Sequence, residues 1–176
     1  VQTCALPIST QIISPASSKP IIKFVQDTLV GAYLFTDEKN LIDKYEFNNL
    51  MMNNPRFDGT YPDAKHNING VKYWSGQQVY STILPDLTVE GSNYKFVNGV
   101  MESGRLAKRL INDVLLQTVH NRYGNKQSKH FLDSTQDLIT RWLTNRSFSI
   151  GFGDTLPSRA IRDTVRAKTQ ESIDKV

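Results

Sequence analysis

A β-hairpin signal in the middle of the chain restricts the fold more than any other sequence feature. Two short strand-like runs, residues 94–97 and 100–103, flank the dipeptide Asn98-Gly99. Asn-Gly tolerates positive φ at both central positions of a type I′ turn, and the twist of that turn matches the twist of paired strands. The sequence therefore predicts an antiparallel hairpin here and excludes an entirely helical fold.

Helical periodicity dominates the chain after this hairpin. Apolar residues recur at helical spacing over residues 105–123, a segment that Gly124 closes, and again over residues 126–145. Pro157 suits the first turn of a last helix that reaches Asp174 and carries only a thin apolar stripe. The second half is therefore predicted to be mainly helical.

The first half mixes short elements with turns. Four further elements are predicted, a buried strand at 21–25, helices at 26–36 and 38–52, and a short helix after Ser75 that ends at about Ile83. Residues 53–72 are rich in turn-forming residues. Together with the hairpin, these elements predict an α+β fold in which helices surround short strands.

Three residues are predicted to have structural roles. Gly31 lies in the first of these helices and is expected to permit close packing against a neighbouring element. Trp74 and Trp142 are expected to belong to the core, because large aromatic side chains remove much apolar surface from water.

Length and composition limit the class of protein. A chain of 176 residues is long enough for one domain, or for one domain and a fragment of another. The mean hydropathy is −0.41, and no run of about 20 apolar residues is present, so no segment is expected to span a membrane. The single cysteine, Cys4, excludes an internal disulfide framework and a cysteine-based metal cluster.

Positive charge gathers in the second half of the chain. Residues 1–88 hold 7 Lys and Arg against 8 Asp and Glu, whereas residues 89–176 hold 14 against 9. Clustered positive charge attracts phosphate groups. The candidates for such contact are Arg105, Lys108 and Arg109, whose i, i+3, i+4 spacing would let them face one way on a helix. The same spacing also fits an ordinary amphipathic helix with a solvated basic face.

Residues for a self-sufficient active site are not evident. No metal-ligand spacing connects the three histidines, which are expected to be exposed or capping residues: His66, His120 and His130. The Gly-x-Gly sequence at 151–153 lacks the third glycine of a dinucleotide-binding fingerprint. Asp58-Gly59 has one further carboxylate nearby, Asp63, so a turn is favoured over a two-metal site.

Four ordered motifs resemble the largest subunit of multisubunit DNA-directed RNA polymerases. The first is Ser-Pro-Ala-Ser-Ser-Lys-Pro with the following Val-Gln-Asp-Thr-Leu-Val-Gly, at 14–31. The others are Tyr-Trp-Ser-Gly-Gln-Gln at 73–78, Val-Asn-Gly-Val-Met-Glu-Ser-Gly at 97–104 and Phe-Ser-Ile-Gly-Phe-Gly-Asp-Thr at 148–155. The resemblance covers about residues 9–176 and is nearest to the eukaryotic-type or large-DNA-virus branch. Ser147 and Phe152 depart from the family pattern.

The resemblance implies a division of the chain into parts of that subunit. Residues 9–20 would end the active-site domain, 21–146 would form the pore domain, and 147–176 would begin the funnel domain. Residues 1–8 do not match the family. They are interpreted as a non-native remnant of a sequencing adapter and are left out of the fold prediction.

The resemblance also implies a function. The fragment would form part of the pore, or secondary channel, through which NTPs enter and the 3′ end of backtracked RNA leaves. Lys108 and Arg109 would correspond to a basic pair after the hairpin that contacts RNA or NTP phosphates, with Arg105 as a further candidate. The parent enzyme is a nucleotidyltransferase that uses Mg²⁺. Its catalytic aspartate loop, Asn-Ala-Asp-Phe-Asp-Gly-Asp, is absent from this sequence, so no catalytic or metal-binding residue is assigned.

The implied partners are those of a transcribing enzyme. They are the other polymerase subunits, the DNA template, the nascent RNA, NTPs and a transcript-cleavage elongation factor. A membrane is not among the implied partners. The expected location is the nucleus, or a cytoplasmic viral factory for a viral enzyme. An alternative is a stand-alone, non-catalytic helical protein that binds nucleic acid or acts as an adaptor. That alternative predicts sealed apolar faces, whereas the polymerase interpretation predicts a last helix with an uncovered apolar stripe.

Overall fold

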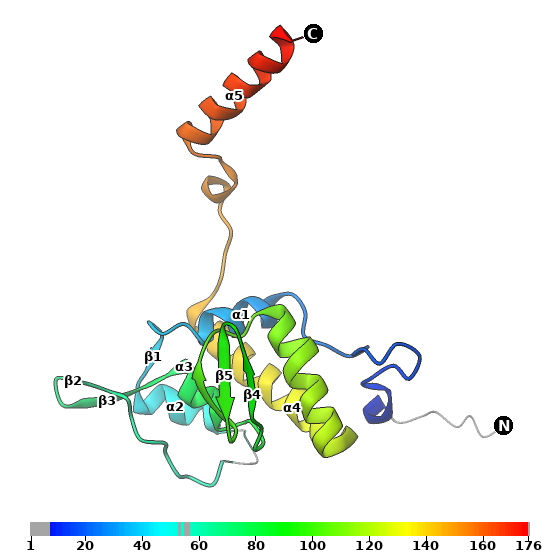
Figure 1. The fold of residues 1–176 in the computed structure, drawn as a ribbon. Coiled ribbons are helices and arrows are strands. Elements are labelled where there is room, and N and C mark those ends of the chain that lie inside the picture. Colours follow the sequence, from blue (N-terminus) through cyan, green and yellow to red (C-terminus); the bar gives the residue numbers. More distant parts are fainter. Residues whose placement is uncertain (1–7, 53, 55–56, 176) are drawn as a thin grey trace. The chain divides into compact units, whose positions relative to one another are not determined.

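The computed structural model describes residues 8–52, 54 and 57–175. The chain divides into two compact units, Val1–Asn145 and Arg146–Val176. Figure 1 shows the course of the chain and the labels of its elements. The helices in chain order are η1 (Ile8–Gln11), α1 (Asp27–Phe35), α2 (Lys44–Met51), α3 (Gly76–Ser81), η2 (Leu110–Leu115), α4 (Leu116–Arg146), η3 (Phe152–Thr155) and α5 (Arg159–Asp174). The strands are β1 (Leu41–Ile42), β2 (His66–Ile68), β3 (Val71–Ser75), β4 (Val89–Gly91), β5 (Tyr94–Val97) and β6 (Val100–Ser103). This mixture of helices and small sheets confirms the α+β class.

The predicted hairpin is confirmed as β5 and β6. Asn98 and Gly99 have φ values of 49° and 79°, and the register places Val97 opposite Val100. A third strand, β4, pairs with the outer edge of β5 to give an antiparallel sheet of order β4-β5-β6. β4 was not predicted, because its three residues show no alternation of apolar and polar side chains.

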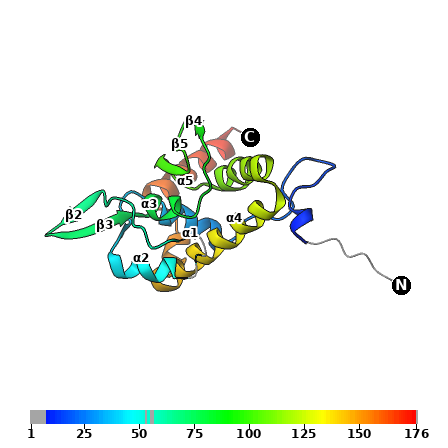
Figure 2. The same cartoon turned by 90° about the horizontal axis from the view of Figure 1, so that it is seen from below.

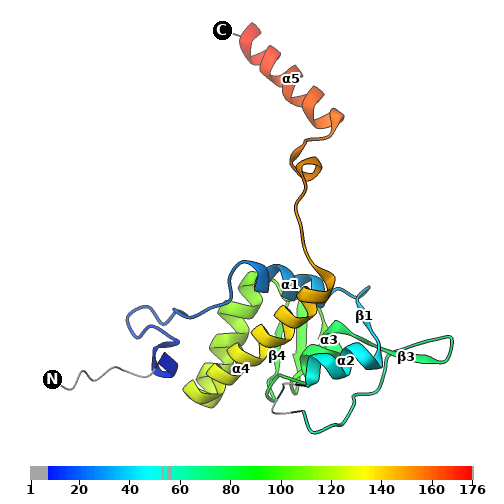
Figure 3. The same cartoon turned by 180° about the vertical axis from the view of Figure 1, so that it is seen from behind.

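A second antiparallel sheet has the order β1-β3-β2. It lies in the turn-rich region and contains a hairpin, β2–β3, around Asn69 and Gly70, which also have positive φ. All three residues of β2 are exposed. In Figures 1 and 3 this hairpin projects away from the helices of the first unit.

Two predictions for the first half were wrong. Residues 21–25 form no strand, and both Ile21 and Val25 are exposed. The predicted helix at 38–52 is shorter, since β1 occupies its expected start and α2 begins only after Asp43. The Asp43 side chain accepts a hydrogen bond from the backbone N–H of Glu46 and caps α2.

The short helix after Ser75 is confirmed as α3. The Ser75 hydroxyl accepts from the backbone N–H of Gln78, and the Gln78 side chain accepts from the backbone N–H of Ser75. This reciprocal capping box satisfies two backbone donors that helix formation leaves open.

The start and middle of the long helix differ from a regular α-helix. Residues 104–107 are not helical, and regular helix begins only at Lys108. Residues 110–115 then form a π-helical segment, η2, whose buried Asn112 bonds to the backbone of Phe24. Phe24 N–H donates to Asn112 Oδ1 at 2.8 Å, and Asn112 Nδ2 donates to Phe24 O at 3.0 Å. Gly124, with φ 75° and ψ −172°, breaks α4 at the predicted position.

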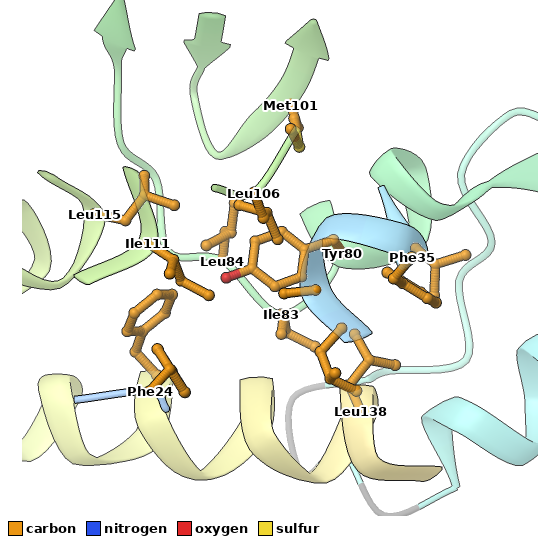
Figure 4. Packing of buried hydrophobic residues seen from close by; sticks show 14 of the residues in the cluster. Phe24, Phe35, Tyr80, Ile83, Leu84, Met101, Leu106, Ile111, Leu115 and Leu138 are labelled. Atoms are coloured by element: carbon orange, nitrogen blue, oxygen red, sulfur yellow. The ribbon is translucent and has the colours of Figure 1, made fainter. Parts of the chain in front are cut away.

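One hydrophobic core joins the helices and sheets of the first unit. Figure 4 shows the Tyr80 ring between the loop after β6, which supplies Leu106, and the helix that carries Leu138. The Tyr80 hydroxyl lies 3.3 Å from Thr135 Oγ1, and burial raises the pKa of Tyr80. Trp74 and Trp142 are both buried, as predicted.

Gly31 fits its predicted role. A Cβ atom at this position would lie 2.5 Å from Cγ2 of Ile139, so only glycine allows α1 to approach the second half of α4 this closely. Figure 2 shows α1 beside α4 from below.

The second unit consists of η3 and α5 with their connections. Ser158 caps α5 by accepting from the backbone N–H of Ile161, and no residue of α5 is buried. The apolar stripe of the helix, Ile161, Val165 and Ile173, is therefore uncovered. None of the helices in the described part of the chain has the length and apolar character needed to cross a bilayer.

Candidate phosphate-contacting groove

The segment that follows β6 is not helical, and the end of α1 and α3 both bond to its backbone. Leu106 N–H donates to Thr36 Oγ1 at 2.9 Å, and Gln77 Nε2 donates to Gly104 O at 2.8 Å. Gly104 has φ 101°, and a Cβ there would lie 2.5 Å from Asn93 O. These contacts fix the backbone just before the predicted basic residues.

Arg105 is half-buried and bound to α1. Its guanidinium forms an ion pair with Asp37 Oδ2 and lies 5.0 Å from the centre of the Tyr33 ring. A hydrogen bond to Tyr33, assisted by the charge of Asp37, raises the pKa of Arg105, so the guanidinium stays charged at physiological pH. The other carboxylate oxygen of Asp37 accepts from the backbone N–H of Lys39 and holds the acid in place.

Lys108 and Arg109 are exposed, and no ion pair joins either of them to another residue in the described ranges. They stand on the first helical turn, whereas Arg105 lies before it. The predicted single helical face of three basic residues is therefore wrong. The helix starts late because the Leu106 N–H and the Gly104 carbonyl bond to Thr36 and Gln77 and not within a helix.

A groove of about 440 Å³ nevertheless brings two of the three predicted residues together. Arg105 and Arg109 line this groove, and we call them the arginine wall. Residues 91–94, which comprise the turn between β4 and β5 and the adjoining strand ends, also line it, and we call them the turn wall. The remaining lining residues are apolar: Ala107, Leu110 and Val114. Lys108 is not among its lining residues. Figure 1 shows this sheet beside the first half of α4. We call this feature the turn–arginine groove.

Sequence reasoning missed both the turn wall of the groove and the two residues that hold Arg105, which are Tyr33 and Asp37. Ser92-Asn93 is a turn signal that follows Gly91 and marks a loop. The approach of this turn to Gly104, however, is a tertiary contact between segments that no local pattern connects. Likewise, no local sequence pattern connects Tyr33 or Asp37 with Arg105.

The other motifs have structural roles. Asp58 Oδ1 accepts from the backbone N–H of Thr60 at 2.9 Å, and this bond lowers the pKa of Asp58, as expected for the predicted turn. His120 lies 3.3 Å from the Ser128 hydroxyl, across the bend at Gly124. Within residues 8–52, 54 and 57–175, no group of three or more His, Cys, Asp and Glu side chains could hold a metal ion.

The chemistry that the groove offers is anion binding. The Arg109 guanidinium provides positive charge without an ion-pair partner among the described residues, whereas the charge of Arg105 is offset by Asp37. Guanidinium groups match the oxygen geometry of phosphates. The groove is open, and its walls supply hydrogen-bonding groups in addition to charge.

Comparison with known proteins gives a consistent family. The family model described as RNA polymerase Rpb1, domain 3, matches residues 11–155. The DNA-directed RNA polymerase subunit Rpo1N of Halobacterium salinarum is 28% identical over 178 residues, which cover 96% of this chain and 18% of that subunit. The probable DNA-directed RNA polymerase II subunit RPB1 homolog of Invertebrate iridescent virus 6 is 30% identical over 92% of this chain and 18% of its own length.

A third relative is the DNA-directed RNA polymerase subunit 1 of Acanthamoeba polyphaga mimivirus. It is 28% identical over 94% of this chain and 11% of its own length. The chain thus spans less than one fifth of each of these relatives.

Proposed function

The chain belongs to the RNA polymerase Rpb1 domain 3 family, and on this basis we propose that it forms part of the wall of the pore in a DNA-directed RNA polymerase. In this role it borders the passage through which NTPs enter and the 3′ end of backtracked RNA leaves. The nucleotidyl transfer itself, with its Mg²⁺, is assigned to parts of the enzyme outside this chain. The template, the transcript and the other subunits are its proposed partners.

The observation that carries this proposal is the family match together with two basic side chains that have no ion-pair partner among the described residues. Lys108 and Arg109 directly follow the hairpin motif and are exposed. Both cargoes of the passage are polyanions, so positive charge on its wall lowers the electrostatic cost of entry. An open groove suits transit, because a closed, tight site would retain the cargo.

Exposed apolar side chains of the second unit support the proposal that the chain assembles into a larger enzyme. Ile161, Val165 and Ile173 are all more than half exposed on α5, and Phe152 before it is 80% exposed. Apolar surface of this kind is normally covered by a partner. The alternative of a stand-alone nucleic-acid-binding or adaptor protein predicts sealed apolar faces, and this helix does not fit that alternative.

The proposal is tested by charge reversal in the assembled polymerase. The double variant Lys108→Glu and Arg109→Glu should slow recovery from backtracked states, measured as the rate of transcript cleavage and restart, by about tenfold or more, because two phosphate contacts become repulsive. Subunit assembly, measured by gel filtration, should be unchanged. The matched control is Arg122→Glu with Lys126→Glu, which applies the same charge change to exposed positions outside the groove. Equal recovery rates in the two double variants would contradict a role of these residues in the channel.

A further inference from the structure

The two walls of the turn–arginine groove are held together before any ligand arrives. The backbone of Gly104, which leads into the arginine wall, lies so close to Asn93 O on the turn wall that no Cβ would fit between them. The arginine wall is also tied to α1 through Thr36 and Asp37. Binding in this groove therefore requires little ordering of the chain, which favours affinity for a small ligand.

The two arginines have different tasks. Arg105 is engaged by Asp37 and Tyr33, so its charge is offset by the carboxylate and its side chain shapes the wall. Arg109 has no carboxylate partner among the described residues and keeps its guanidinium available. Arg109 is therefore the residue that can form a bidentate contact with a phosphate group.

The turn wall carries an aromatic ring in a fixed position. A Cβ at residue 91 would lie 2.5 Å from Cζ of Tyr94, so the Tyr94 ring rests directly on the Gly91 backbone. The ring of Phe96 lies 6.3 Å away, centre to centre, and supports the same side chain. Tyr94 is half-buried and lines the groove. Proteins that bind single-stranded nucleic acid combine aromatic side chains, on which the bases stack, with basic side chains that contact the phosphates.

The rim between ring and arginine is polar. Ser92 and Asn93 are exposed and line the groove, so they offer a hydroxyl and a carboxamide. Such groups can bond to base edges and to a ribose 2′-hydroxyl. The volume of about 440 Å³ lies in the range of small-ligand sites, about 300–1,000 Å³.

From these observations we infer that the turn–arginine groove binds one nucleotide of single-stranded RNA, with its phosphate on Arg109 and its base against Tyr94. The inference rests on the proposed function in that RNA is the expected cargo. It goes further, because it assigns a base-contacting wall, residues 91–94, to a site that positive charge alone had indicated.

The test is a titration of the full chain, followed by NMR at low ionic strength, with two probes. Pentauridylate carries bases and phosphates, whereas tripolyphosphate carries phosphates only. Both should shift the amide signals of residues 105–110, and only pentauridylate should also shift those of 92–94. Arg109→Ala should weaken the binding of both probes by about tenfold, because a charge-assisted contact is lost. Arg122→Ala, at an exposed position outside the groove, should change neither.

Two substitutions at Tyr94 distinguish loss of the base contact from loss of folding. Tyr94→Leu keeps the apolar bulk and should weaken the binding of pentauridylate by about fivefold or more, whereas the binding of tripolyphosphate should be unchanged. Tyr94→Phe keeps the ring and should bind both probes like the original chain. Unchanged pentauridylate binding by Tyr94→Leu, or signal shifts confined to other parts of the chain, would overturn the inference. The charge-reversal assay on Lys108 and Arg109 in the assembled polymerase would still decide the channel role separately.

Discussion

The two hairpins of the first unit are built on the same turn and have opposite surroundings. Asn69-Gly70 and Asn98-Gly99 have nearly equal positive φ values, 52° and 82° in the former and 49° and 79° in the latter. Phe96 and Met101 pair across β5–β6 and are fully buried, whereas Ile68 and Val71 pair across β2–β3 and are about half exposed. The turn dipeptide thus sets how the chain reverses, and the packing of the strands decides whether the hairpin belongs to the core.

The largest expected difference between the hairpins comes from truncating a strand side chain. Phe96→Ala should lower the free energy of unfolding by about 3–5 kcal/mol, since it opens a cavity in the core. Ile68→Ala, which truncates a half-exposed side chain of β2–β3, should change the free energy of unfolding by no more than about 0.5 kcal/mol. Urea unfolding followed by circular dichroism measures both. Equal losses would show that β2–β3 packs as tightly as β5–β6.

Adding a methyl group at the turn glycines should separate the hairpins less. Both substitutions place a Cβ at positive φ, which costs about 1 kcal/mol. At Gly99 the new Cβ would also lie 2.8 Å from Pro85 O, whereas nothing lies within 4 Å at Gly70. Gly99→Ala should therefore lose about 2–3 kcal/mol in total and Gly70→Ala about 1 kcal/mol. A larger loss at Gly70, measured by thermal unfolding, would reverse the comparison.

The smallest expected effect is electrostatic and belongs to β5–β6 alone. The hydrogen bond from Lys95 to Glu102, with the charge of Glu102, raises the pKa of Lys95 in the folded chain. A lysine with a raised pKa stabilises the fold below its unfolded pKa, and this stabilisation is lost as the pH rises through the folded value. Stability should therefore decline slightly more on the alkaline side for the original chain than for Lys95→Met, in which this titration is removed. Identical alkaline profiles in thermal unfolding would mean that this exposed pair contributes nothing.

Local signals in the sequence were sufficient for some elements. The hairpin at β5–β6 was predicted because Asn98-Gly99 and its flanking strands agree, and α3 because Ser75 is a suitable N-cap residue. Residues 21–25 were predicted to be a strand because they are apolar. The backbone of Phe24 instead bonds to the carboxamide of Asn112, which is distant in the sequence. Strand β1 was likewise missed because its two residues are recognisable only through pairing with β3.

The candidate site shows the same limit. Arg105 and Arg109 were predicted from charge and spacing, and they do line one groove. The prediction of one shared helix was wrong, because hydrogen bonds to two other elements keep the backbone around Arg105 out of the helix. The turn wall with Tyr94 could not be predicted, since its position depends on the contact of Gly104 with the turn. The family resemblance indicated the basic pair after the hairpin but did not indicate residues 91–94.

The π-helical segment at 110–115 has a geometric consequence for the basic residues that precede it. A π-helical turn holds one more residue than an α-helical turn, and each residue of a helix advances the direction of its side chain by about 100°. Deleting one residue within this segment would restore the α-helical repeat and leave the direction of Lys108 and Arg109 about the axis of α4 almost unchanged, because a π-helical turn of about 4.6 residues and an α-helical turn of about 3.6 residues both complete one revolution. An insertion in a regular α-helical stretch would instead turn these charges by that angle, so the widened turn accommodates an additional residue while Lys108 and Arg109 keep their direction relative to the remainder of the long helix.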